Sequence, residues 1–490
     1  MAGPPRVVVI GGGVSAASFA VQLVRSTSTA VHIAIIEPRE HVGRGLAYSA
    51  TDPDHRLNAP LDIHWIDPNR LGELREWCES KHVLQQDPGC WTANGQVFLR
   101  RSDLGEYLSD QVQRHASDAR TGSTIRHIRD FATAVRRVDG LYRIDTASGS
   151  EFTGEMLVIA TGNPVPGLRP PFSQEDASDL RIIGNPLEPD CLNRITPAAR
   201  VLVVGSGLTA LDIVSTLVRR DSSANVLVVS RRGLRPRPQS PETLQGPPRP
   251  PVLGTDIPEF IASQPVRIVA WSRAVRNEVA RCVAEGQSWY QAFDPVRDVV
   301  WKLWPALPTR EKERFLRRLR VFYDVHRFRT PPMNEVMAGE AERHGNVRYA
   351  AATLRTVVAD PDLVRIELVS GSPKASVWHE FDFVVNCTGL DSASAWRSNP
   401  LLHVLLDSGM LRLHPTGVGF DVTECCEAFD AQGAAQPTLR VIGPPTAGAC
   451  GDPVAIPFIA NQVHRIVPHV LRALQSTSQA ESIHEHDSVE

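Results

Sequence analysis

The stretch Val7-Val-Val-Ile-Gly-Gly-Gly-Val-Ser-Ala-Ala17 decides the fold of this 490-residue chain. Its β-branched start, Val7 to Ile10, predicts a strand that is buried on both faces. Glycines follow, and a helix is expected from about Ser15 to Val24. The next apolar run, His32 to Ile36, predicts a second strand, which ends at Glu37. A strand, a helix and a strand within about 35 residues are typical of a parallel βαβ unit.

The glycine turn of this unit has the spacing Gly11-x-Gly13-x-x-Ala16. Gly11 permits a tight turn, Gly13 lets the backbone approach a pyrophosphate, and Ala16 keeps the helix close to the strand. Ser15 lies in the first helical turn, whose N-terminus would face the phosphates. Glu37 ends the second strand, where a carboxylate can accept hydrogen bonds from ribose hydroxyls. A glycine-rich turn in an unrelated α/β domain is the alternative, but strand, helix and acid together predict a dinucleotide site.

A second unit of the same kind begins at the strand Val201 to Val204. Its turn has the same spacing, Gly205 to Ala210, but its second strand ends in Arg231 and Arg232 instead of an acid. Two guanidiniums there suit the 2′-phosphate of NADPH, which a carboxylate would repel. If these side chains are merely solvated, NADH remains possible. The residues assigned to this second site are Gly205, Gly207, Thr209, Ala210, Arg231 and Arg232.

Two β-runs that end in Thr-Gly turns accompany the second unit. One ends at Thr161-Gly162 before it, and the other ends at Thr388-Gly389 after it. At such turns the missing Cβ allows the backbone to approach a cofactor closely. The order of glycine motif, Thr-Gly, glycine motif and Thr-Gly resembles that of flavoproteins with two dinucleotide-binding domains. The resemblance implies FAD on the first motif and NADPH on the second, with a chain that returns to the FAD domain at its end.

Further motifs narrow the resemblance. They are His41-Val-Gly-Arg-Gly-Leu-Ala-Tyr-Ser49, Leu57-Asn-Ala-Pro60, Ser230-Arg-Arg-Gly233 and Asp324-Val-His-Arg-Phe-Arg329. They are similar to those of an FAD/NAD(P)-binding subfamily that includes a bacterial FAD-dependent urate hydroxylase, and a related group N-hydroxylates amino acids. The resemblance implies that Arg44 and Gly45 lie along the FAD pyrophosphate and that Arg56 and Asn58 approach the flavin. It also implies that Gly443 and Asp452 belong to a C-terminal segment that closes over the flavin.

Simpler roles stay open for some of these residues, since Arg44 could be a surface side chain and Asp452 a helix N-cap. Between Ile182 and Glu188 the sequence lacks the His of the motif that Baeyer–Villiger enzymes carry there. This departure counts against Baeyer–Villiger chemistry.

The sequence therefore predicts an α/β fold with two Rossmann-like dinucleotide-binding domains. We expect a discontinuous FAD domain of residues 1–190 and 381–474, and an inserted NADPH domain of residues 191–380. Within the latter, residues 235–335 would form a Pro-rich loop and a helical insertion, with Thr309 as an N-cap and Phe315, Leu316, Leu319 and Phe322 on one helical face. The polar tail, 475–490, is expected to be disordered.

Composition excludes several other classes of protein. The formal net charge of −3 does not favour nucleic acid or an anionic membrane as partner. Cysteine spacing provides neither a CxxC redox dithiol nor a zinc-finger site, so no metal is expected. Without an export signal or a long apolar run, we expect a cytoplasmic protein with reduced thiols whose partners are a small-molecule substrate and O2.

No triad or metal pattern is present, so the cofactors would carry the chemistry. We expect an FAD-dependent NAD(P)H monooxygenase that acts through a flavin C4a-hydroperoxide, with urate 5-hydroxylation as the best named candidate. Two alternatives are an N-hydroxylase of an amino acid or amine and a flavin-binding redox or electron-transfer protein. Candidate catalytic residues, each with a structural role as the alternative, are His64, His326, Arg327 and Arg329.

Overall fold

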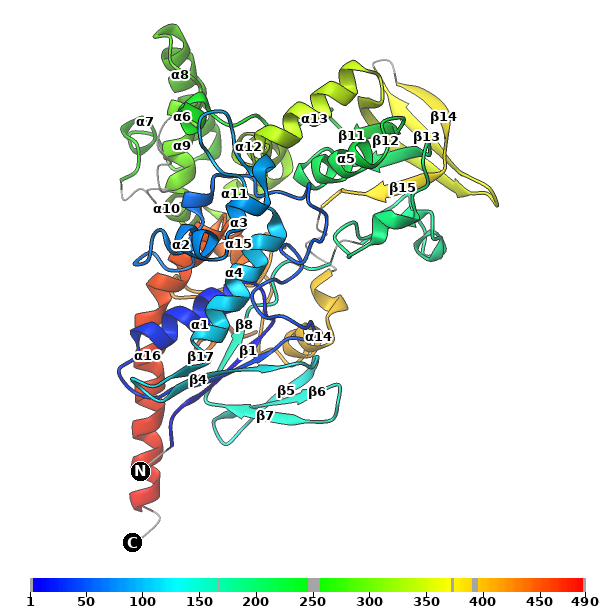
Figure 1. Ribbon diagram of the computed structural model, residues 1–490. Helices are drawn as coiled ribbons and strands as arrows, with labels where there is room; N and C mark the ends of the chain where they lie inside the picture. Colours follow the sequence, from blue (N-terminus) through cyan, green and yellow to red (C-terminus); the bar gives the residue numbers. More distant parts are fainter. Residues whose placement is uncertain (1–2, 166, 246–255, 372–373, 390–394, 488–490) are drawn as a thin grey trace.

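The computed structural model describes residues 3–165, 167–245, 256–371, 374–389 and 395–487. Two sheets dominate it, one in the lower half of Figure 1 and one at the upper right, with a group of helices at the upper left. This is the predicted α/β architecture with two dinucleotide-binding domains. Within the described ranges, none of the helices combines the length and the apolar character that a membrane crossing requires.

The first sheet has seven strands in the order β16-β17-β8-β1-β2-β4-β3. Its centre is β1 (Arg6–Ile10), which pairs in parallel with β2 (His32–Ile36) and β8 (Met156–Ile159). The strand β17 (Ala435–Val441) pairs in parallel with β8, so the end of the chain completes this sheet, as predicted. The other strands are β3 (Ser117–Asp118), β4 (Ser123–Ile128) and β16 (Glu427–Phe429).

Helices cover this sheet on both faces. Buried side chains of α1 (Val14–Ser26), α4 (Arg101–Arg114) and α16 (Ile456–Asp487) form one core with β1, β2 and β8. On the other face, α14 (Pro400–Asp407) packs with a three-stranded antiparallel sheet of β5 (Ala132–Val138), β6 (Leu141–Thr146) and β7 (Glu151–Gly154). The shorter helices are α2 (Glu73–Ser80), α3 (Val83–Gln86) and α15 (Ala447–Cys450).

The second sheet has the order β14-β13-β12-β11-β10-β15-β9. Four strands run parallel to their neighbours: β9 (Ile182–Ile183), β10 (Arg200–Val204), β11 (Asn225–Ser230) and β15 (Phe383–Asn386). The long strand β12 (Val347–Ala359) joins β11 in parallel and then forms an antiparallel meander with β13 (Val364–Ser370) and β14 (Ala375–Phe381). The helices α5 (Leu208–Arg220) and α13 (Pro332–Arg343) pack on this sheet.

The helical insertion, at the upper left of Figure 1, has a hydrophobic core of its own. Its helices are α6 (Pro241–Gln245), α7 (Glu259–Ala262), α8 (Ile268–Ala284), α9 (Tyr290–Asp298), α10 (Val300–Ala306), α11 (Thr309–Arg318) and α12 (Arg320–Arg327). Phe315, Leu316 and Leu319 pack against this core as expected, whereas Phe322 is 42% exposed.

Two local predictions differ from the structure. Thr309 is the first helical residue of α11 and not its N-cap, because Pro308 occupies the capping position without a side-chain cap. The helix α16 continues to Asp487, through most of the segment that was expected to be disordered. Ala, Gln and Glu in that segment have good helix propensity, so the helix can continue beyond its packed turns.

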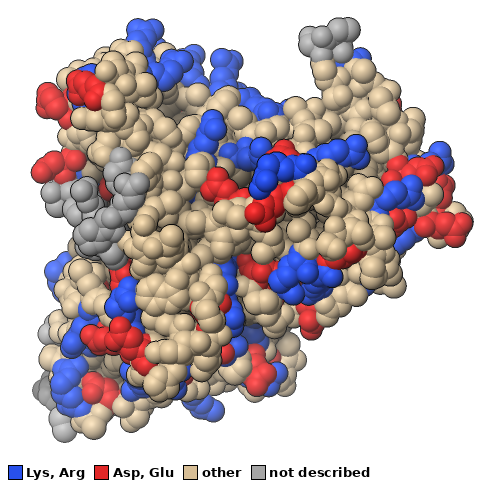
Figure 2. Space-filling model, turned by 45° about the horizontal axis from the view of Figure 1, so that its top comes forward, with Lys and Arg blue, Asp and Glu red and all other residues tan. Residues whose placement is uncertain are grey.

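Charged side chains of both signs lie on the face of the molecule that Figure 2 shows. Figure 2 shows basic and acidic side chains interspersed over much of the visible face. Within the described residues, no group of His, Cys, Asp and Glu is arranged to hold a metal ion.

Candidate functional site

The first glycine turn lies against the first Thr-Gly turn. Gly11 has φ of +95°, and a Cβ on it would lie 2.7 Å from the carbonyl oxygen of Ala160. Gly45 also has positive φ, and its Cβ would lie 3.0 Å from Cα of Gly13. The loop of Gly45 is tied to this turn because Gly43 N donates to the carbonyl oxygen of Gly12 at 2.6 Å. Backbone therefore approaches backbone here in a way that only glycine permits.

Glu37 is held at the same turn. Its side chain is buried, and Oε2 accepts a hydrogen bond from Gly12 N at 2.7 Å. Oε1 accepts from Arg39 N at 3.0 Å and from Arg39 Nη1 at 3.1 Å. The carboxylate thus stands at the end of β2 beside the glycine turn, which is the position expected for an acid that contacts a ribose.

The C-terminal segment closes onto the N-terminus of α1. Gly443 has φ of +73°, and a Cβ on it would lie only 2.2 Å from Ser15 Oγ. Gly443 N donates to Gln462 Oε1 at 2.7 Å, and Gln462 Nε2 donates to Thr446 Oγ1 at 2.8 Å. Gly443 thus lies at the glycine turn, and we define the first cradle as residues 11–16 with 43–45, 161–162 and 443.

Buried polar atoms without a hydrogen-bond partner indicate whether FAD would fit this cradle. Arg44 Nε and Thr161 Oγ1 are buried and have no hydrogen-bond partner among the described residues. Buried polar atoms are rarely left unsatisfied in a folded protein, so both positions call for an additional partner. Phosphate and ribityl oxygens of FAD would supply such partners, and Gly162, with φ of +70° and open space at its Cβ position, leaves room beside them.

The second glycine turn repeats this geometry. Gly205 has φ of +109°, and its Cβ would lie 2.2 Å from the carbonyl oxygen of Cys387, next to Thr388. Open space surrounds the Cβ positions of Gly207 and Gly389. The helix α5, with Thr209 and Ala210 in its first turn, starts directly after Gly207. A nucleotide phosphate can therefore reach the N-terminus of α5 without a steric obstacle.

Arg231 and Arg232 follow β11 at the rim of this second cradle, and both are exposed. The guanidinium of Arg232 lies 4.9 Å from the centroid of the Phe322 ring on the helical insertion. The two basic side chains are thus available beside the strand end where a nucleotide ribose binds in this fold.

Polar contacts join the two domains between the cradles. Gln239, from the Pro-rich segment, is buried, and its Nε2 donates to the carbonyl oxygens of Asn58 at 2.8 Å and Thr330 at 3.0 Å. Asn334 Nδ2 donates to the carbonyl oxygen of Asp54 at 2.8 Å. The described part of the Pro-rich segment, residues 235–245, therefore connects the two domains at Asn58, and we call it the Pro-rich strut.

Asp452 faces the helical insertion. Its Oδ2 accepts from Arg327 Nε at 2.6 Å and from the Tyr323 hydroxyl at 3.3 Å. Burial acts to lower the pKa of Arg327, but the charge and hydrogen bond of Asp452 together with Tyr323 and Asp298 outweigh it, so this pKa lies above its usual range. Arg327 Nη2 is buried without a partner among the described residues. Because α16 begins at Ile456, Asp452 is not its N-cap, so the capping alternative is wrong.

His326 and Arg329 lie beside this ion pair in an aromatic setting. Arg329 is buried, its Nη1 donates to Asp294 Oδ2 at 3.1 Å, and its guanidinium lies 4.5 Å from the Tyr290 ring centroid. The His326 ring meets Trp289 edge to face at 4.8 Å, and burial lowers the pKa of His326. Arg329 thus already has a carboxylate partner, and His326 is neutral near pH 7.

His64 and Arg56 have structural partners of their own. His64 is buried, its Nδ1 lies 2.9 Å from the carbonyl oxygen of Pro60, and burial lowers its pKa to about 4. A neutral His64 does not provide a cation for an anionic substrate. Arg56 Nη1 donates to Asp87 Oδ2 at 2.8 Å and to Phe98 O at 2.9 Å, so its charge is already balanced by a carboxylate.

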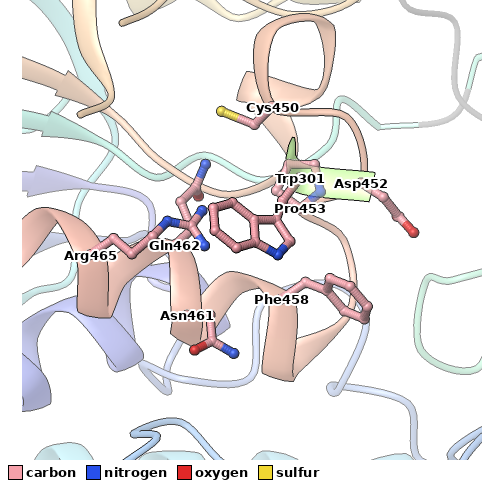
Figure 3. Close-up of a pocket in the computed structure, with 8 residues that line it drawn as sticks. All are labelled: Trp301, Cys450, Asp452, Pro453, Phe458, Asn461, Gln462 and Arg465. Atoms are coloured by element: carbon pink, nitrogen blue, oxygen red, sulfur yellow. The ribbon is translucent and has the colours of Figure 1, made fainter. Parts of the chain in front are cut away.

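A pocket lies on the flank of α16 near Asp452 (Figure 3). Its walls come from the C-terminal segment, the first turns of α16 and Trp301 of α10. The Arg465 guanidinium lies 4.4 Å from the Trp301 ring centroid at one side of it. The lining residues are Trp301, Cys450, Asp452, Pro453, Phe458, Asn461, Gln462 and Arg465.

Sequence reasoning missed several residues that organise this region. They are Gln239, Asp294, Tyr323 and Gln462. Each acts through a partner that is distant in the sequence, and none belongs to a recognisable motif. A polar Gln within the Pro-rich stretch was the one available signal, since a buried amide needs several hydrogen-bond partners.

Two protein-family models match parts of this chain. Residues 8–164 match a family model described as FAD-NAD(P)-binding. Residues 90–245 match a model described as L-lysine 6-monooxygenase/L-ornithine 5-monooxygenase. No curated protein sequence matches the chain.

Solved structures share the fold over nearly the whole chain. The ornithine N-hydroxylase of Kutzneria sp. 744, solved with reduced FAD, NADP+ and L-ornithine, is 15% identical, covers 97% of this chain and 100% of its own, and has a TM-score of 0.63. The reduced ornithine hydroxylase of Pseudomonas aeruginosa is 13% identical, with coverage of 96% and 100% and a TM-score of 0.63. The L-lysine 6-monooxygenase of Pseudomonas syringae is 16% identical, with coverage of 96% and 99% and a TM-score of 0.60.

These findings confirm part of the sequence interpretation and correct another part. The fold and the cofactors, FAD with NADP(H), are confirmed, and the matched models support the class of FAD-dependent NAD(P)H monooxygenases. The choice of urate as the best substrate candidate is wrong, because the matched monooxygenase model and the solved structures concern lysine and ornithine hydroxylation. The N-hydroxylase alternative is favoured instead.

Proposed function

We propose that this protein N-hydroxylates the side-chain or terminal amine of an amino acid or a diamine, with NADPH and O2 as co-substrates. The observation that carries the proposal is the match of residues 90–245 to the lysine/ornithine monooxygenase model. This segment contains α4, β10 and α5, and it ends at residue 245 in the Pro-rich strut. It therefore spans parts of both cradles and the junction between them.

The first cradle would hold FAD. Arg44 and Thr161 would direct their unpartnered atoms to it, Gly13 and Gly45 would admit the pyrophosphate, and Glu37 would accept from the adenosine ribose. When bound, FAD takes up electrons from NADPH and passes them to O2, which supplies the oxygen atom of the product.

The second cradle would hold NADPH. Gly205 and Gly207 would admit its pyrophosphate, with Thr209 at the helix N-terminus, while Thr388 and Gly389 would border the opposite side. Arg231 and Arg232 would bind the 2′-phosphate through charge-assisted hydrogen bonds. An exposed pair of guanidiniums at this strand end favours NADPH over NADH.

The junction beside Asp452 would bind the amine substrate. Arg327 Nη2 is a buried donor without a partner among the described residues, and it suits a carboxylate of an amino-acid substrate. Asp452 keeps this guanidinium fixed through Nε. A neutral His326 can accept a proton, and an amine must lose one before its nitrogen can attack an electrophilic oxygen.

A substrate screen tests the proposal. Purified holoenzyme would be supplied with NADPH and air, and with L-ornithine, L-lysine, putrescine, cadaverine or urate in parallel. We expect one of the amines to stimulate NADPH oxidation and to yield a hydroxylamine in near-equal amount to the NADPH consumed.

Formation of hydrogen peroxide alone with every amine in an extended panel would overturn the proposal. Preference for L-ornithine or L-lysine over the diamines would support the carboxylate role of Arg327. That preference should then disappear in Arg327→Met, and the diamine rate of the same variant serves as the reference for any general effect of breaking the ion pair with Asp452.

A further inference from the structure

The helix α5, which begins directly after the second glycine turn, contacts the domain of the first sheet along one of its faces. Asp212, Thr216 and Arg219 follow one another at four and three residues, so their side chains lie on the same face of the helix. Asp212 and Thr216 are buried, and each of the three side chains meets a partner from the other domain. The helix that carries the second cradle is therefore fixed side-on to the domain of the first cradle.

The innermost contact of this face is an ion pair between two helices. Arg101, the first residue of α4, places Nη2 at 2.8 Å from Oδ2 of Asp212. The two side chains are 19% and 5% exposed, so the pair is largely withdrawn from water. Over the part of the chain that the structure describes, neither side chain has a second ion-pair partner within 4.0 Å. Because a buried charge that loses its partner is costly, this pair holds α4 against α5.

Both helices of the pair belong to a nucleotide cradle. The helix α4 packs on the first cradle, because a Cβ at Gly105 would lie 3.1 Å from Cγ of Arg44. A Cβ at Gly43, in the same cradle, would lie 2.8 Å from the carbonyl carbon of Leu108 in α4. The helix α5 belongs to the second cradle, because Gly207 is its N-cap. Direct contacts therefore run from one cradle through α4 and α5 to the other, with the ion pair as the middle link.

Two further contacts hold the same face of α5. Thr216 Oγ1 lies 3.3 Å from Nε2 of His55. At the C-terminal end of the helix, Arg219 pairs with Asp54 and, at 3.1 Å, with Asp52. Contacts at both ends of α5 resist its rotation against the domain of the first sheet.

We propose that Arg101 and Asp212 are positioning residues, which set the orientation of the NADPH nicotinamide relative to the flavin. The inference rests on the proposed placement of FAD in the first cradle and NADPH in the second, and it is independent of the amine. In the step concerned, one hydride passes from NADPH to FAD, which leaves NADP+ and the reduced flavin anion. Such a transfer needs its reacting atoms in near contact, and a displacement of about 1 Å can lower a rate about a hundredfold.

The test measures reduction of the flavin by NADPH in the holoenzyme, without an amine and without oxygen. Arg101→Gln removes one charge of the pair, and Asp212→Asn removes the other with almost no change of shape. In each variant we expect the limiting rate of flavin reduction to fall between about tenfold and about a hundredfold, while the dissociation constant for NADPH stays close to the wild-type value. The double variant should be no slower than the slower single variant, because both residues act through one contact. Arg101→Lys, which keeps the charge, should recover part of the lost rate.

A spectrum reports the geometry without turnover. NADP+ added to the chemically reduced holoenzyme produces a long-wavelength charge-transfer absorbance where the nicotinamide stacks on the flavin. At saturating NADP+ we expect this absorbance in the wild type and a weaker one in Arg101→Gln. Reduction by dithionite, which bypasses the second cradle, should proceed at the wild-type rate in the same variant.

Arg25→Gln is the matched control. Arg25 pairs with Asp67 at 2.9 Å and with Glu73 at 2.8 Å, and the side chains of Arg25 and Asp67 are 18% and 6% exposed. This ion pair thus has nearly the same length and burial, but all of its members belong to the domain of the first sheet. The control variant should lose stability and keep the limiting rate of flavin reduction.

Several results would overturn the proposal. One is a wild-type limiting rate in both Arg101→Gln and Asp212→Asn, and another is an equal fall of that rate in Arg25→Gln. A third is weaker NADPH binding with an unchanged limiting rate. If Arg101→Gln does not fold, the isosteric Asp212→Asn decides the case. Wild-type protein that NADPH does not reduce would refute the cradle assignment and this inference with it, whereas normal flavin reduction with no hydroxylated amine would refute only the proposed function.

Discussion

Replacement of Arg231 by alanine tests the assignment of the second cradle to NADPH. Arg231 and Arg232 are both exposed at the end of β11. A hydrogen bond to a charged group contributes about 1.5–3 kcal/mol, and exposure to solvent and salt favours the lower end. Since about 1.4 kcal/mol corresponds to a tenfold change, Arg231→Ala should lower kcat/KM for NADPH about tenfold. The double change with Arg232→Ala should lower it up to about a hundredfold.

The same variants should leave kcat/KM for NADH almost unchanged, because NADH has no 2′-phosphate. The assay is the rate of flavin reduction under anaerobic conditions over a range of each nucleotide, which separates binding from later steps. Higher ionic strength should weaken the wild-type preference for NADPH, because an exposed contact is screened.

Two control variants sharpen this prediction. Arg235→Ala removes a nearby guanidinium that already pairs with Glu342 at 2.8 Å and lies 4.1 Å from the Tyr349 ring centroid, so it should not change nucleotide preference. Phe322→Leu removes the ring beneath Arg232 and keeps the charge. If Arg231→Ala reduced the use of NADH and NADPH equally, the reasoning about the 2′-phosphate would be refuted.

Three further predictions concern the first cradle and its surroundings. Gly11→Val should yield protein without bound FAD, measured by the loss of the yellow flavin absorbance, because a Cβ at residue 11 would lie 2.7 Å from Ala160 O; a fully yellow variant would contradict this. Asp452→Asn leaves Arg327 buried without a counter-charge, a loss of about 3–5 kcal/mol, and should lower Tm by several degrees, with partial recovery in the double variant with Arg327→Met. His64 has a pKa of about 4, below its value in the unfolded chain, so its contribution, about 3 kcal/mol, is complete above pH 6.5 and is lost as pH falls toward 4. His64→Gln should therefore flatten the dependence of Tm on pH between 7 and 4; an unchanged slope would show that His64 titrates normally.

Strong local patterns made much of the fold predictable. The run His32 to Ile36 is a strand with the predicted bounds, and Val7 to Ile10 lies within the strand β1, because short runs of buried β-branched residues leave few alternatives. The three-stranded sheet of β5, β6 and β7 was not predicted. Its strands place Arg, Thr and Asp among the apolar residues without a strict alternation, and tertiary packing on α14 stabilises them.

The site was predictable only where chemistry is local in the sequence. Glycine turns and strand ends carry their own signals, so Gly11 and Gly205 could be recognised in isolation. Arg56 and Asp452 could not, because their partners, Asp87 and Arg327, are 31 and 125 residues away and decide what their charges do. The substrate prediction failed for a related reason, since a resemblance in the cradles says little about the pocket beside them.

The strut formed by Gln239 limits how the enzyme can exchange its nicotinamide cofactor. A large hinge rotation of one domain away from the other would remove the Asn58 carbonyl from this buried amide, although it would leave the Thr330 carbonyl in place, and it would break the contact of Asn334 with Asp54 as well. The loss of these buried interdomain hydrogen bonds costs free energy. Oxidised nucleotide should therefore depart along the open rim by local side-chain and loop movement, with the relative orientation of the two sheets preserved throughout the catalytic cycle.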